Sequence, residues 1–359
     1  MSHLASMHGM TLTGHGGLEK LEWREDLPVP APKPGEVLIR VGAAAVNNTD
    51  INTRTGWYSK SVRGDTAFGA SGGYGSSQAG AEGSWAGKPL AFPLIQGADC
   101  CGRIVSVGAG VDAGRIGDRV LVRPIQSRPT ADGGMATLTF GSECNGGFAQ
   151  YTAALSVDAI KVESGLSDVD LASFPCAFST AEGMIQRCSL GAERVLITGA
   201  SGGVGSAAIQ LAKRRGAHVT AVTTAAKAAD LRALGADETL DRDASLPAAA
   251  FDVVLDLVGG PRWPDLIDSL RNRGRYVTSG AIAGPIVELD LRTLYLRDLS
   301  LLGSTHQPDT VFTDLVGYIE AGEIRPVLAA TYPLAQLRTA QEAFLGKSHV
   351  GKIGIAVSD

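Results

Sequence analysis

The sequence contains few cysteines and no long apolar run. Its five Cys include no C-x-x-C pair, so we expect neither a structural zinc knuckle nor a disulfide framework. No segment approaches the roughly 18–20 consecutive apolar residues that span a bilayer, and the first residues lack the apolar stretch of a signal peptide. These absences predict a chain that works in the reducing cytoplasm and has no membrane partner.

An excess of positive charge is also missing. The 32 Lys and Arg are outnumbered by 37 Asp and Glu, which gives a net charge of −5, so the molecule as a whole has no cationic face for nucleic acid. A local basic pocket is still allowed. The 359 residues exceed the roughly 250–300 at which single cores usually divide. We therefore expect two domains.

The first part of the chain is a series of short β segments separated by Gly and Pro. Residues 35–46, 101–111 and 117–124 are apolar, strand-like runs, a pattern typical of an antiparallel or barrel-like module. Between them, residues 64–89 are rich in Gly, Ser and Ala and bury too little apolar surface to fold alone. We expect a flexible insertion there. Two interpretations are open: an insertion without a role, or a lid over the site.

After residue 150 strand and helix patterns alternate. Helical spacing after a Ser at an N-cap position predicts a helix within 167–185, and further helices are expected at 207–216, 226–235 and 310–323. The expected strands are 194–200, 218–224, 238–241, 251–258, 274–280 and 299–305. Their continuous apolar runs predict a doubly wound parallel sheet with helices on both faces, an α/β fold. The last strand, 351–357, is free to return to the first domain.

A Gly-rich turn joins the first of these strands to its helix. Residues 200–205 read A-x-G-x-x-G, a variant of the dinucleotide fingerprint, in which glycines let a pyrophosphate approach the main-chain N–H groups at the helix N-terminus. The same residues permit other interpretations. G-x-S-x-G at 199–203 matches a serine hydrolase elbow, but that enzyme needs a downstream His, for which His218, His306 and His349 are weak candidates.

Two further alternatives remain for this turn. Residues 198–205 resemble the fingerprint of short-chain dehydrogenases, but no downstream Tyr is followed by the Tyr-x-x-x-Lys spacing of that family. A Gly-rich turn without any ligand is the last alternative. The small residues 205–208 suit a helix that lies close to a dinucleotide, so the dinucleotide interpretation is favoured.

The end of the second strand indicates which dinucleotide binds. An NAD site places an Asp or Glu about 20 residues after the turn, but this sequence has Thr223, Thr224 and Lys227 there and no acid before Asp230. Hydroxyl groups and an ammonium suit a 2′-phosphate. The cofactor is therefore predicted to be NADP(H). The alternative interpretation of Lys227 is a solvated helix residue without a ligand.

These features together resemble the medium-chain dehydrogenase/reductase superfamily, specifically its zinc-independent quinone oxidoreductase-like and enoyl reductase-like branches. The resemblance rests on AVNNTDINTRTGWY (45–58), GADCCGRIVSVGAGV with GDRV (97–111, 117–120), GGFAQY (146–151), TGASGGVG (198–205) and LGAD (234–237). It implies a Rossmann domain (161–306) inserted into a mainly β, barrel-like, GroES-like catalytic domain (1–160 and 307–359). It also implies a homodimer.

Zinc enzymes of this superfamily hold the metal with a Cys, a His and a second Cys. The corresponding positions here are Asn47, Ala98 and Cys176. One remaining ligand is too few for a zinc site, which needs three protein ligands, so no metal is expected. Cys176 is then either a small buried residue at the domain junction or a ligand or nucleophile.

Without zinc, a hydrogen-bond or proton donor must assist hydride transfer. The segment from Asn47 to Tyr58 is similar to the N-P-S-D-I-N-x-x-x-G-x-Y segment of NADPH-dependent enoyl thioester reductases, although Asn48 replaces the Pro. The resemblance implies that Tyr58, together with Asn47, is catalytic, as a proton donor or an orienting donor. The alternative for Tyr58 is an aromatic wall of the cleft.

The resemblance also implies the cofactor contacts. Asn47 and Thr180 would flank the nicotinamide, Ser201, Gly202, Gly203 and Val204 the pyrophosphate, Thr223, Thr224 and Lys227 the 2′-phosphate; Val258, Gly259, Ser279, Gly280, Gly303, Ser304 and Lys352 complete the set. The expected function is NADPH-dependent reduction of a quinone or an α,β-unsaturated carbonyl or enoyl thioester. The alternatives are a carbonyl or alcohol dehydrogenase of the same superfamily and a non-catalytic NADP(H)-binding sensor.

Overall fold

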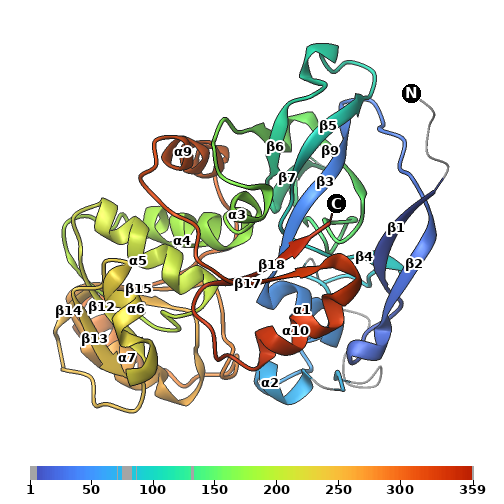
Figure 1. Cartoon of the computed structure of the whole chain (residues 1–359). Helices are drawn as coiled ribbons and strands as arrows, with labels where there is room; N and C mark the ends of the chain where they lie inside the picture. Colours follow the sequence, from blue (N-terminus) through green and yellow to red (C-terminus); the bar gives the residue numbers. More distant parts are fainter. Residues whose placement is uncertain (1–5, 71, 75–82, 86, 131–132, 358–359) are drawn as a thin grey trace.

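The chain forms a mainly β part and a part built on a parallel sheet, which lie side by side (Figure 1). The computed structural model describes residues 6–70, 72–74, 83–85, 87–130 and 133–357. No helix among these residues is long and apolar enough to cross a bilayer.

The β part is centred on a sheet in the order β10-β6-β5-β3-β18-β17, with β9 also paired to β3. Its strands are β3 (Glu36–Val46), β5 (Cys101–Val107), β6 (Arg119–Val122), β9 (Tyr151–Leu155), β10 (Ala159–Lys161), β17 (Leu328–Pro333) and β18 (Lys352–Ala356). A smaller sheet joins β2 (Leu21–Pro28), β1 (Ser6–Leu12) and β4 (Leu94–Ile95), and β7 (Ile125–Pro129) pairs with β8 (Met135–Thr139). The helices here are α1 (Asn48–Thr55), α2 (Thr66–Gly69) and α10 (Leu337–Leu345).

The second part contains a parallel sheet in the order β13-β12-β11-β14-β15-β16. Its strands are β11 (Arg194–Ile197), β12 (His218–Thr223), β13 (Glu238–Asp241), β14 (Phe251–Asp256), β15 (Leu270–Thr278) and β16 (Ser300–Gly303). The associated helices are α4 (Pro175–Arg187), α5 (Gly203–Arg214), α6 (Ala228–Ala233), α7 (Trp263–Ser269), α8 (Leu291–Leu296) and α9 (Asp309–Glu320), whereas α3 (Asp168–Ala172) packs against β3, β5 and β18 of the β part.

Both faces of the parallel sheet are buried. Val195 and Ile197 of β11 share a core with α4 and α5, whereas Leu196, between them, belongs to a second core with α7. Successive side chains of a strand point to opposite faces, so helices cover both. The predicted doubly wound sheet joined to a GroES-like β domain is confirmed.

One of the expected helices is divided at Pro175. The expected helix within 167–185 is two helices: Ser167 caps α3 through a hydrogen bond from the Asp170 N–H, and α4 begins at Pro175. Proline has no N–H and is favoured in the first turn of a helix, so it starts a new helix here.

The end of the chain belongs to both parts. Strand β18 pairs antiparallel with β3, where Ile353 lies opposite Val46. Helix α9, in contrast, packs against α4, and its Phe312 and Leu315 lie in the core shared with α5. Helix α9 thus lies beyond the expected boundary at 306/307 yet packs with the Rossmann part. The domain boundaries stay a prediction.

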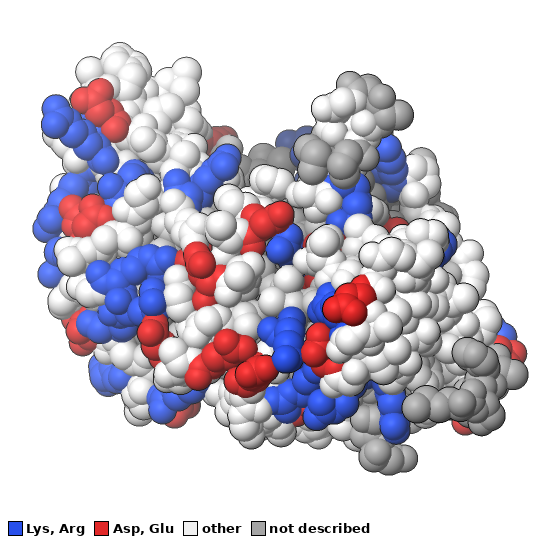
Figure 2. Space-filling model, turned by 90° about the horizontal axis from the view of Figure 1, so that it is seen from above, with Lys and Arg blue, Asp and Glu red and all other residues white. Residues whose placement is uncertain are grey.

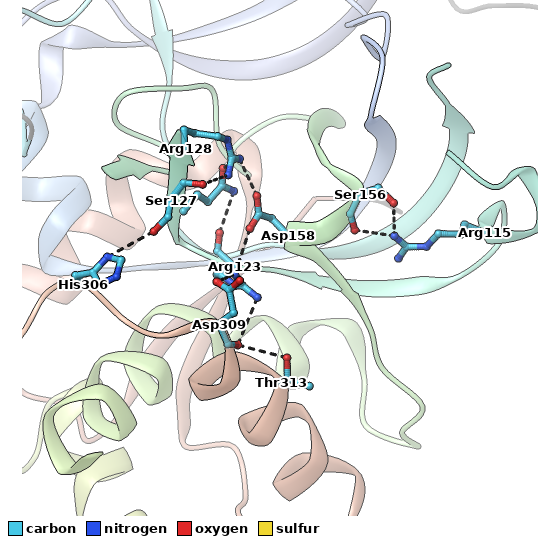
Figure 3. A network of polar contacts seen from close by, with 10 residues as sticks. Arg115, Arg123, Ser127, Arg128, Ser156, Asp158, His306, Asp309 and Thr313 are labelled. Atoms are coloured by element: carbon cyan, nitrogen blue, oxygen red, sulfur yellow. Dashed lines mark hydrogen bonds and ion pairs between the residues drawn. The ribbon is translucent and has the colours of Figure 1, made fainter. Parts of the chain in front are cut away.

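An ionic network ties the start of α9 to the β part (Figure 3). The Arg123 guanidinium lies 3.6 Å from an Asp158 carboxylate oxygen and also pairs with Asp309, the first residue of α9. Arg128 contacts the other Asp158 oxygen at 2.7 Å. Burial raises the pKa of Asp158, and Arg128 and Arg123 oppose that shift. Asp158 thus binds the guanidinium groups of Arg123 and of Arg128 in β7, and Arg123 extends the network to α9.

Part of the 64–89 insertion lies among the described residues, and that part is packed. Asp65 caps the short helix α2, and Tyr74 and Ser84 are buried. Residues 71, 75–82 and 86 lie outside the described residues, so the expected flexibility of the insertion stays a prediction.

Candidate functional site

The Gly-rich turn has the geometry that a dinucleotide needs. Gly199 has a positive φ of 56°, and a Cβ on Gly205 would overlap main-chain atoms of Gly199 and Ala200. Gly205 therefore allows α5 to pack closely on the turn. At Gly202 an added Cβ would meet only Gly199 O, at 3.4 Å, and no side chain caps the helix there. The first N–H groups of α5 are thus open to an anion.

The turn is also fastened to the start of β18. The Gly351 N–H donates to Ser201 O at 2.9 Å, and a Cβ on Gly203 would lie 2.7 Å from Lys352 Cδ. The predicted residues Ser201, Gly202, Gly203 and Lys352 are therefore neighbours, and Val204 follows in the first turn of α5. This contact places the β part directly beside the predicted pyrophosphate site.

The Lys352 ammonium is buried in a polar network. It donates to Asp99 Oδ2 at 2.8 Å, to Val46 O at 3.0 Å and to Asn47 Oδ1. Lys352 is 3% exposed and Asp99 is fully buried. Asp99 Oδ2 also accepts from Asn47 Nδ2 at 2.7 Å, and its Oδ1 accepts from the Cys176 N–H at 2.7 Å. The network therefore joins β3, the 97–100 segment, α4 and β18.

The amide of Asn47 is fully used as a donor. Because the Lys352 ammonium only donates, it fixes Asn47 Oδ1 as the acceptor, and both Nδ2 hydrogens go to Asp99 and, at 3.2 Å, to Ala45 O. Asn47 also stands at the N-cap of α1. Only the side-chain oxygen Oδ1 of Asn47 can still take part in a hydrogen bond with a ligand, as the acceptor. Its predicted catalytic role and nicotinamide contact stay predictions.

Asp50 completes the start of α1. Its carboxylate accepts from the Asn47 N–H at 2.8 Å and from the Ala98 N–H at 3.3 Å. Burial raises the pKa of this carboxyl to about 7, against these hydrogen bonds and Lys352. Asp50 therefore changes protonation near neutral pH, although its hydrogen bonds serve the helix cap.

Cys176 lies in the first turn of α4 and is partly buried. Burial, and secondly Asp99, raise the pKa of its thiol, and a hydrogen bond with Thr180 opposes this shift. A raised pKa disfavours the thiolate, the form that attacks or binds metal. Within the described residues, no three His, Cys, Asp or Glu side chains form a group that could hold a metal ion.

Tyr58 belongs to a small group of aromatic and hydroxyl side chains after α1. Its hydroxyl donates to Thr49 Oγ1 at 3.2 Å, and the Trp85 Nε1–H donates to the same atom at 2.9 Å. The rings of Tyr58 and Trp85 are 5.2 Å apart. Burial raises the pKa of Tyr58, and the proximity of Cys176 adds a smaller increase. The tyrosine therefore remains a neutral hydroxyl, able to donate.

Basic groups gather at the end of β12. The Lys227 ammonium donates to the main-chain oxygens of Lys347 at 2.6 Å and His349 at 2.8 Å. Burial, and then Arg242, lower the pKa of Lys227. The Lys347 ammonium donates to Asn48 Oδ1 at 3.2 Å and lies over the Phe344 ring, and burial, and then Lys227, lower its pKa to about 8. Mutual repulsion of this kind marks a site that an anion would relieve.

Thr223 and Thr224 complete this end of β12. Thr223 is 6% exposed, and its buried Oγ1 has no hydrogen-bond partner. Thr224 is partly buried and precedes the turn that carries Lys227. An unpaired buried hydroxyl beside basic groups fits a ligand that supplies an acceptor. The residues present therefore fit the 2′-phosphate contacts predicted for Thr223, Thr224 and Lys227.

The carboxyl ends of the other parallel strands are held by a buried carboxylate. Asp256 accepts from Thr198 Oγ1 and from the Tyr276 hydroxyl, both at 2.5 Å, and from the Val258 and Gly259 N–H groups at 2.9 and 3.1 Å. These bonds fix three strand ends at the edge where ligands of open α/β sheets bind. The remaining predicted contacts lie on the same edge: Ser279, Gly280, Gly303 and Ser304, with the Ser279 hydroxyl donating to Ser304 O.

Several residues of the site were missed from the sequence. Asp99, Thr49 and Asp256 carry the networks described above, Trp85 contacts the Tyr58 group, and Lys347 and His349 lie beside Lys227. The available signal was weak. Asp99 and Thr49 lie in segments that resemble the family, 97–111 and 45–58. Trp85, in contrast, lies in a Gly-rich segment, and Lys347 is 120 positions from Lys227 in the sequence.

Acidic and basic side chains are interspersed on the face shown in Figure 2. No field of one sign dominates that face. This agrees with the near balance of 32 basic and 37 acidic residues.

Comparisons with known proteins agree with this geometry. Residues 33–164 match the alcohol dehydrogenase GroES-like domain, and residues 203–320 match the zinc-binding dehydrogenase family model. Acryloyl-coenzyme A reductase of Metallosphaera sedula is 28% identical, with 97% of this chain and 99% of the relative covered. Human quinone oxidoreductase is 26% identical, with 97% of each chain covered.

A solved structure is similar to this chain at a higher sequence identity. A putative alcohol dehydrogenase from Sinorhizobium meliloti 1021 is 42% identical, with 99% of this chain and 98% of that chain covered, at a TM-score of 0.86. The chain belongs to the medium-chain dehydrogenase/reductase superfamily. It is an oxidoreductase of that superfamily, whose members bind nicotinamide cofactors.

Proposed function

We propose that the protein is a zinc-independent, NADPH-dependent reductase of quinones or α,β-unsaturated carbonyl compounds, including enoyl thioesters. The observation that carries the proposal is the Lys352 ammonium bound to Asn47 and Asp99. This polar cluster already contains a cation, and Cys176 is the only side chain left at the three positions that bind zinc in relatives with the metal. These residues do not fit a zinc ion, which requires three protein ligands.

Each group has a definable task in such a reductase. When bound, the nicotinamide supplies a hydride from C4. The open N–H groups at the start of α5 suit the pyrophosphate, and Lys227 with Thr223 suits the 2′-phosphate. Tyr58 and Thr49 supply hydroxyl protons, and Tyr58 is held neutral by burial. An acceptor carbonyl that accepts a hydrogen bond from this pair becomes more electrophilic, which favours hydride addition at its conjugated carbon.

A carbonyl or alcohol dehydrogenase is the second candidate. The 42% identical relative is described as a putative alcohol dehydrogenase. Both candidates use the same cofactor chemistry but differ in the acceptor and in the need for metal. The homodimer and the cytoplasmic location stay proposals that rest on the resemblance and the composition.

The decisive test is oxidation of NADPH and NADH at 340 nm with quinones, enones, enoyl thioesters, ketones and aldehydes, each with and without a chelator. We expect turnover of quinones or conjugated acceptors with NADPH, unchanged by the chelator. Chelator-sensitive turnover of ketones or alcohols would overturn the proposal in favour of the second candidate. Tight NADPH binding without turnover of any acceptor would indicate a sensor instead.

The basic group at the end of β12 gives a separate prediction. Replacing Lys227 and Lys347 together by Ala should raise the Kd for NADPH by more than about 100-fold and change the Kd for NADH less than about threefold, because two charge-assisted hydrogen bonds of roughly 1.5–3 kcal/mol each are lost. Fluorescence titration of each cofactor measures both. The exposed pair Lys60→Ala and Lys88→Ala is the control. Equal losses for both cofactors would contradict a 2′-phosphate site.

The same site predicts a pH dependence. The pKa of Lys347 is lowered to about 8, and a bound phosphate would raise it back toward its ordinary value. The protonated form therefore binds NADPH better, so affinity should be highest below pH 8 and fall as pH rises above it. NADH affinity should lack this step.

A further inference from the structure

The described residues of the 64–89 insertion are anchored on both sides of the site. The Trp57 Nε1–H donates to Gly64 O at 3.0 Å, and the Thr66 N–H donates to Ile282 O, in the loop after β15, at 3.0 Å. At the other end, a Cβ on Gly83 would lie 2.6 Å from His15 Nε2. The insertion therefore contacts both parts of the chain, and its residue Trp85 has a fixed place beside Tyr58.

The hydrogen bonds around Thr49 decide where protons point. An indole N–H only donates, so Trp85 necessarily uses one lone pair of Thr49 Oγ1. Thr49 and Tyr58 share one further hydrogen bond, in which Tyr58 donates. In that arrangement both lone pairs of Thr49 are occupied, and its own proton is free to point to a ligand. If Thr49 instead donates to Tyr58, the Tyr58 proton points to a ligand or to the side chain of Asn52, which also hydrogen-bonds the Tyr58 hydroxyl.

The arrangement in which Tyr58 donates to Thr49 leaves the Thr49 proton for an acceptor. Without the indole N–H, Thr49 Oγ1 could accept a hydrogen bond from the ligand or from water, and the pair would lose this bias. Because the Trp85 N–H can only donate, it favours the arrangement in which the Thr49 and Tyr58 hydroxyls together donate a proton to a ligand. The tilted contact between the Trp85 and Tyr58 rings, at 5.2 Å, also restricts the ring of Tyr58.

We propose that Trp85 is a positioning residue that orients the Thr49–Tyr58 hydroxyl pair as a net proton donor to the acceptor, which deepens the proposed function and rests on it. In the reaction, hydride adds to the conjugated carbon of the acceptor, and the electron pair of the C=C bond moves toward the carbonyl. One O–H bond of the pair breaks as its proton passes to the carbonyl oxygen or the α-carbon. The pair regains a proton from water.

The test is Trp85→Phe, which keeps an aromatic ring and removes the N–H. We expect kcat to fall about tenfold, the equivalent of one hydrogen bond of roughly 1.4 kcal/mol, with KM for the acceptor changed less than about twofold. The solvent deuterium isotope effect on kcat should rise, because proton delivery becomes slower relative to hydride transfer. Thr49→Ser should retain most activity, and Thr49→Val should lose as much as Trp85→Phe.

Two control variants separate positioning from structure. Trp57→Phe removes the other indole N–H next to Tyr58, whose ring lies 5.7 Å away, but that N–H only anchors the insertion. Phe68→Ser changes a side chain of the same insertion that is 79% exposed. Neither should raise the isotope effect. If Trp57→Phe matches Trp85→Phe in kcat and isotope effect, or if Trp85→Phe raises only KM, the positioning role is wrong.

Tyr58→Phe distinguishes failure of this inference from failure of the proposed function. If Tyr58→Phe loses activity but Trp85→Phe does not, the pair donates without Trp85, and only the positioning role fails. If neither variant loses reduction of a quinone or enone, the hydroxyl donor itself is wrong. Melting temperatures of all variants, measured with the same samples, identify any that fail to fold.

Discussion

Replacement of Lys352 by Met is expected to lower the free energy of unfolding by about 3–5 kcal/mol, the usual cost of leaving one partner of a buried ion pair uncompensated. Asp99 is fully buried, and the variant leaves its charge with only the neutral donors Asn47 and Cys176 N–H. Urea denaturation of the cofactor-free protein, followed by circular dichroism, measures the change.

The double variant Lys352→Met with Asp99→Asn identifies the cause of this loss. Removing both charges should recover part of the stability, since a neutral pair of similar volume has no buried charge to compensate. The control is Arg24→Met, which breaks the exposed pair between Arg24 and Asp26 and should change the stability little, because exposed ion pairs contribute little to it. If Lys352→Met is no more harmful than Arg24→Met, the buried network does not hold the two parts together.

The order of the strands in the Rossmann part could be predicted from sequence because each of these strands carries its own apolar run. Strand β13 has the bounds that its pattern predicted, 238–241, and the Gly-rich turn was found where the strand ends and the helix begins. The helical spacing within 167–185 predicts one helix, but Pro175 divides this stretch into α3 and α4. Local propensity thus accounts for most of the fold.

The polar network could not be predicted, because its members are far apart in the chain. Lys352 and Asp99 are separated by 253 positions, and the Gly-Ala-Asp segment shows a missing metal ligand without showing what replaces it. Asn47 illustrates the same limit. Its position suggested contact with the nicotinamide, whereas the structure commits both amide hydrogens to protein acceptors. Side-chain pairing depends on the folded arrangement, which single-sequence motifs do not contain.

Trp85 shows why the insertion was hard to interpret. A segment rich in Gly and Ser predicts little buried surface, and a single aromatic residue does not change that composition. Its importance arises from one hydrogen bond to Thr49, 36 positions earlier. The two interpretations of the insertion, one without a role and a lid over the site, both stay predictions.

The change Tyr58→Phe is expected to lower kcat for the preferred acceptor about 100-fold, at the lower end of the 10²–10⁴ that a positioned proton donor contributes. The ring and its contacts with Trp57 and Trp85 remain, so KM should change less than about threefold. Stopped-flow and steady-state oxidation of NADPH measure both. Tyr295→Phe, the same chemical change on a side chain that is 62% exposed, is the control.

The pH profile distinguishes a proton donor from an aromatic wall. Because burial raises the pKa of Tyr58 above its ordinary value, the hydroxyl stays protonated through neutral and moderately alkaline pH, and wild-type kcat should show no loss from tyrosine ionisation below about pH 10. Full activity of Tyr58→Phe across this range would mean that the tyrosine only lines the cleft. A 100-fold loss with unchanged KM places its hydroxyl in the transition state, since a group that acts there lowers kcat without weakening substrate binding.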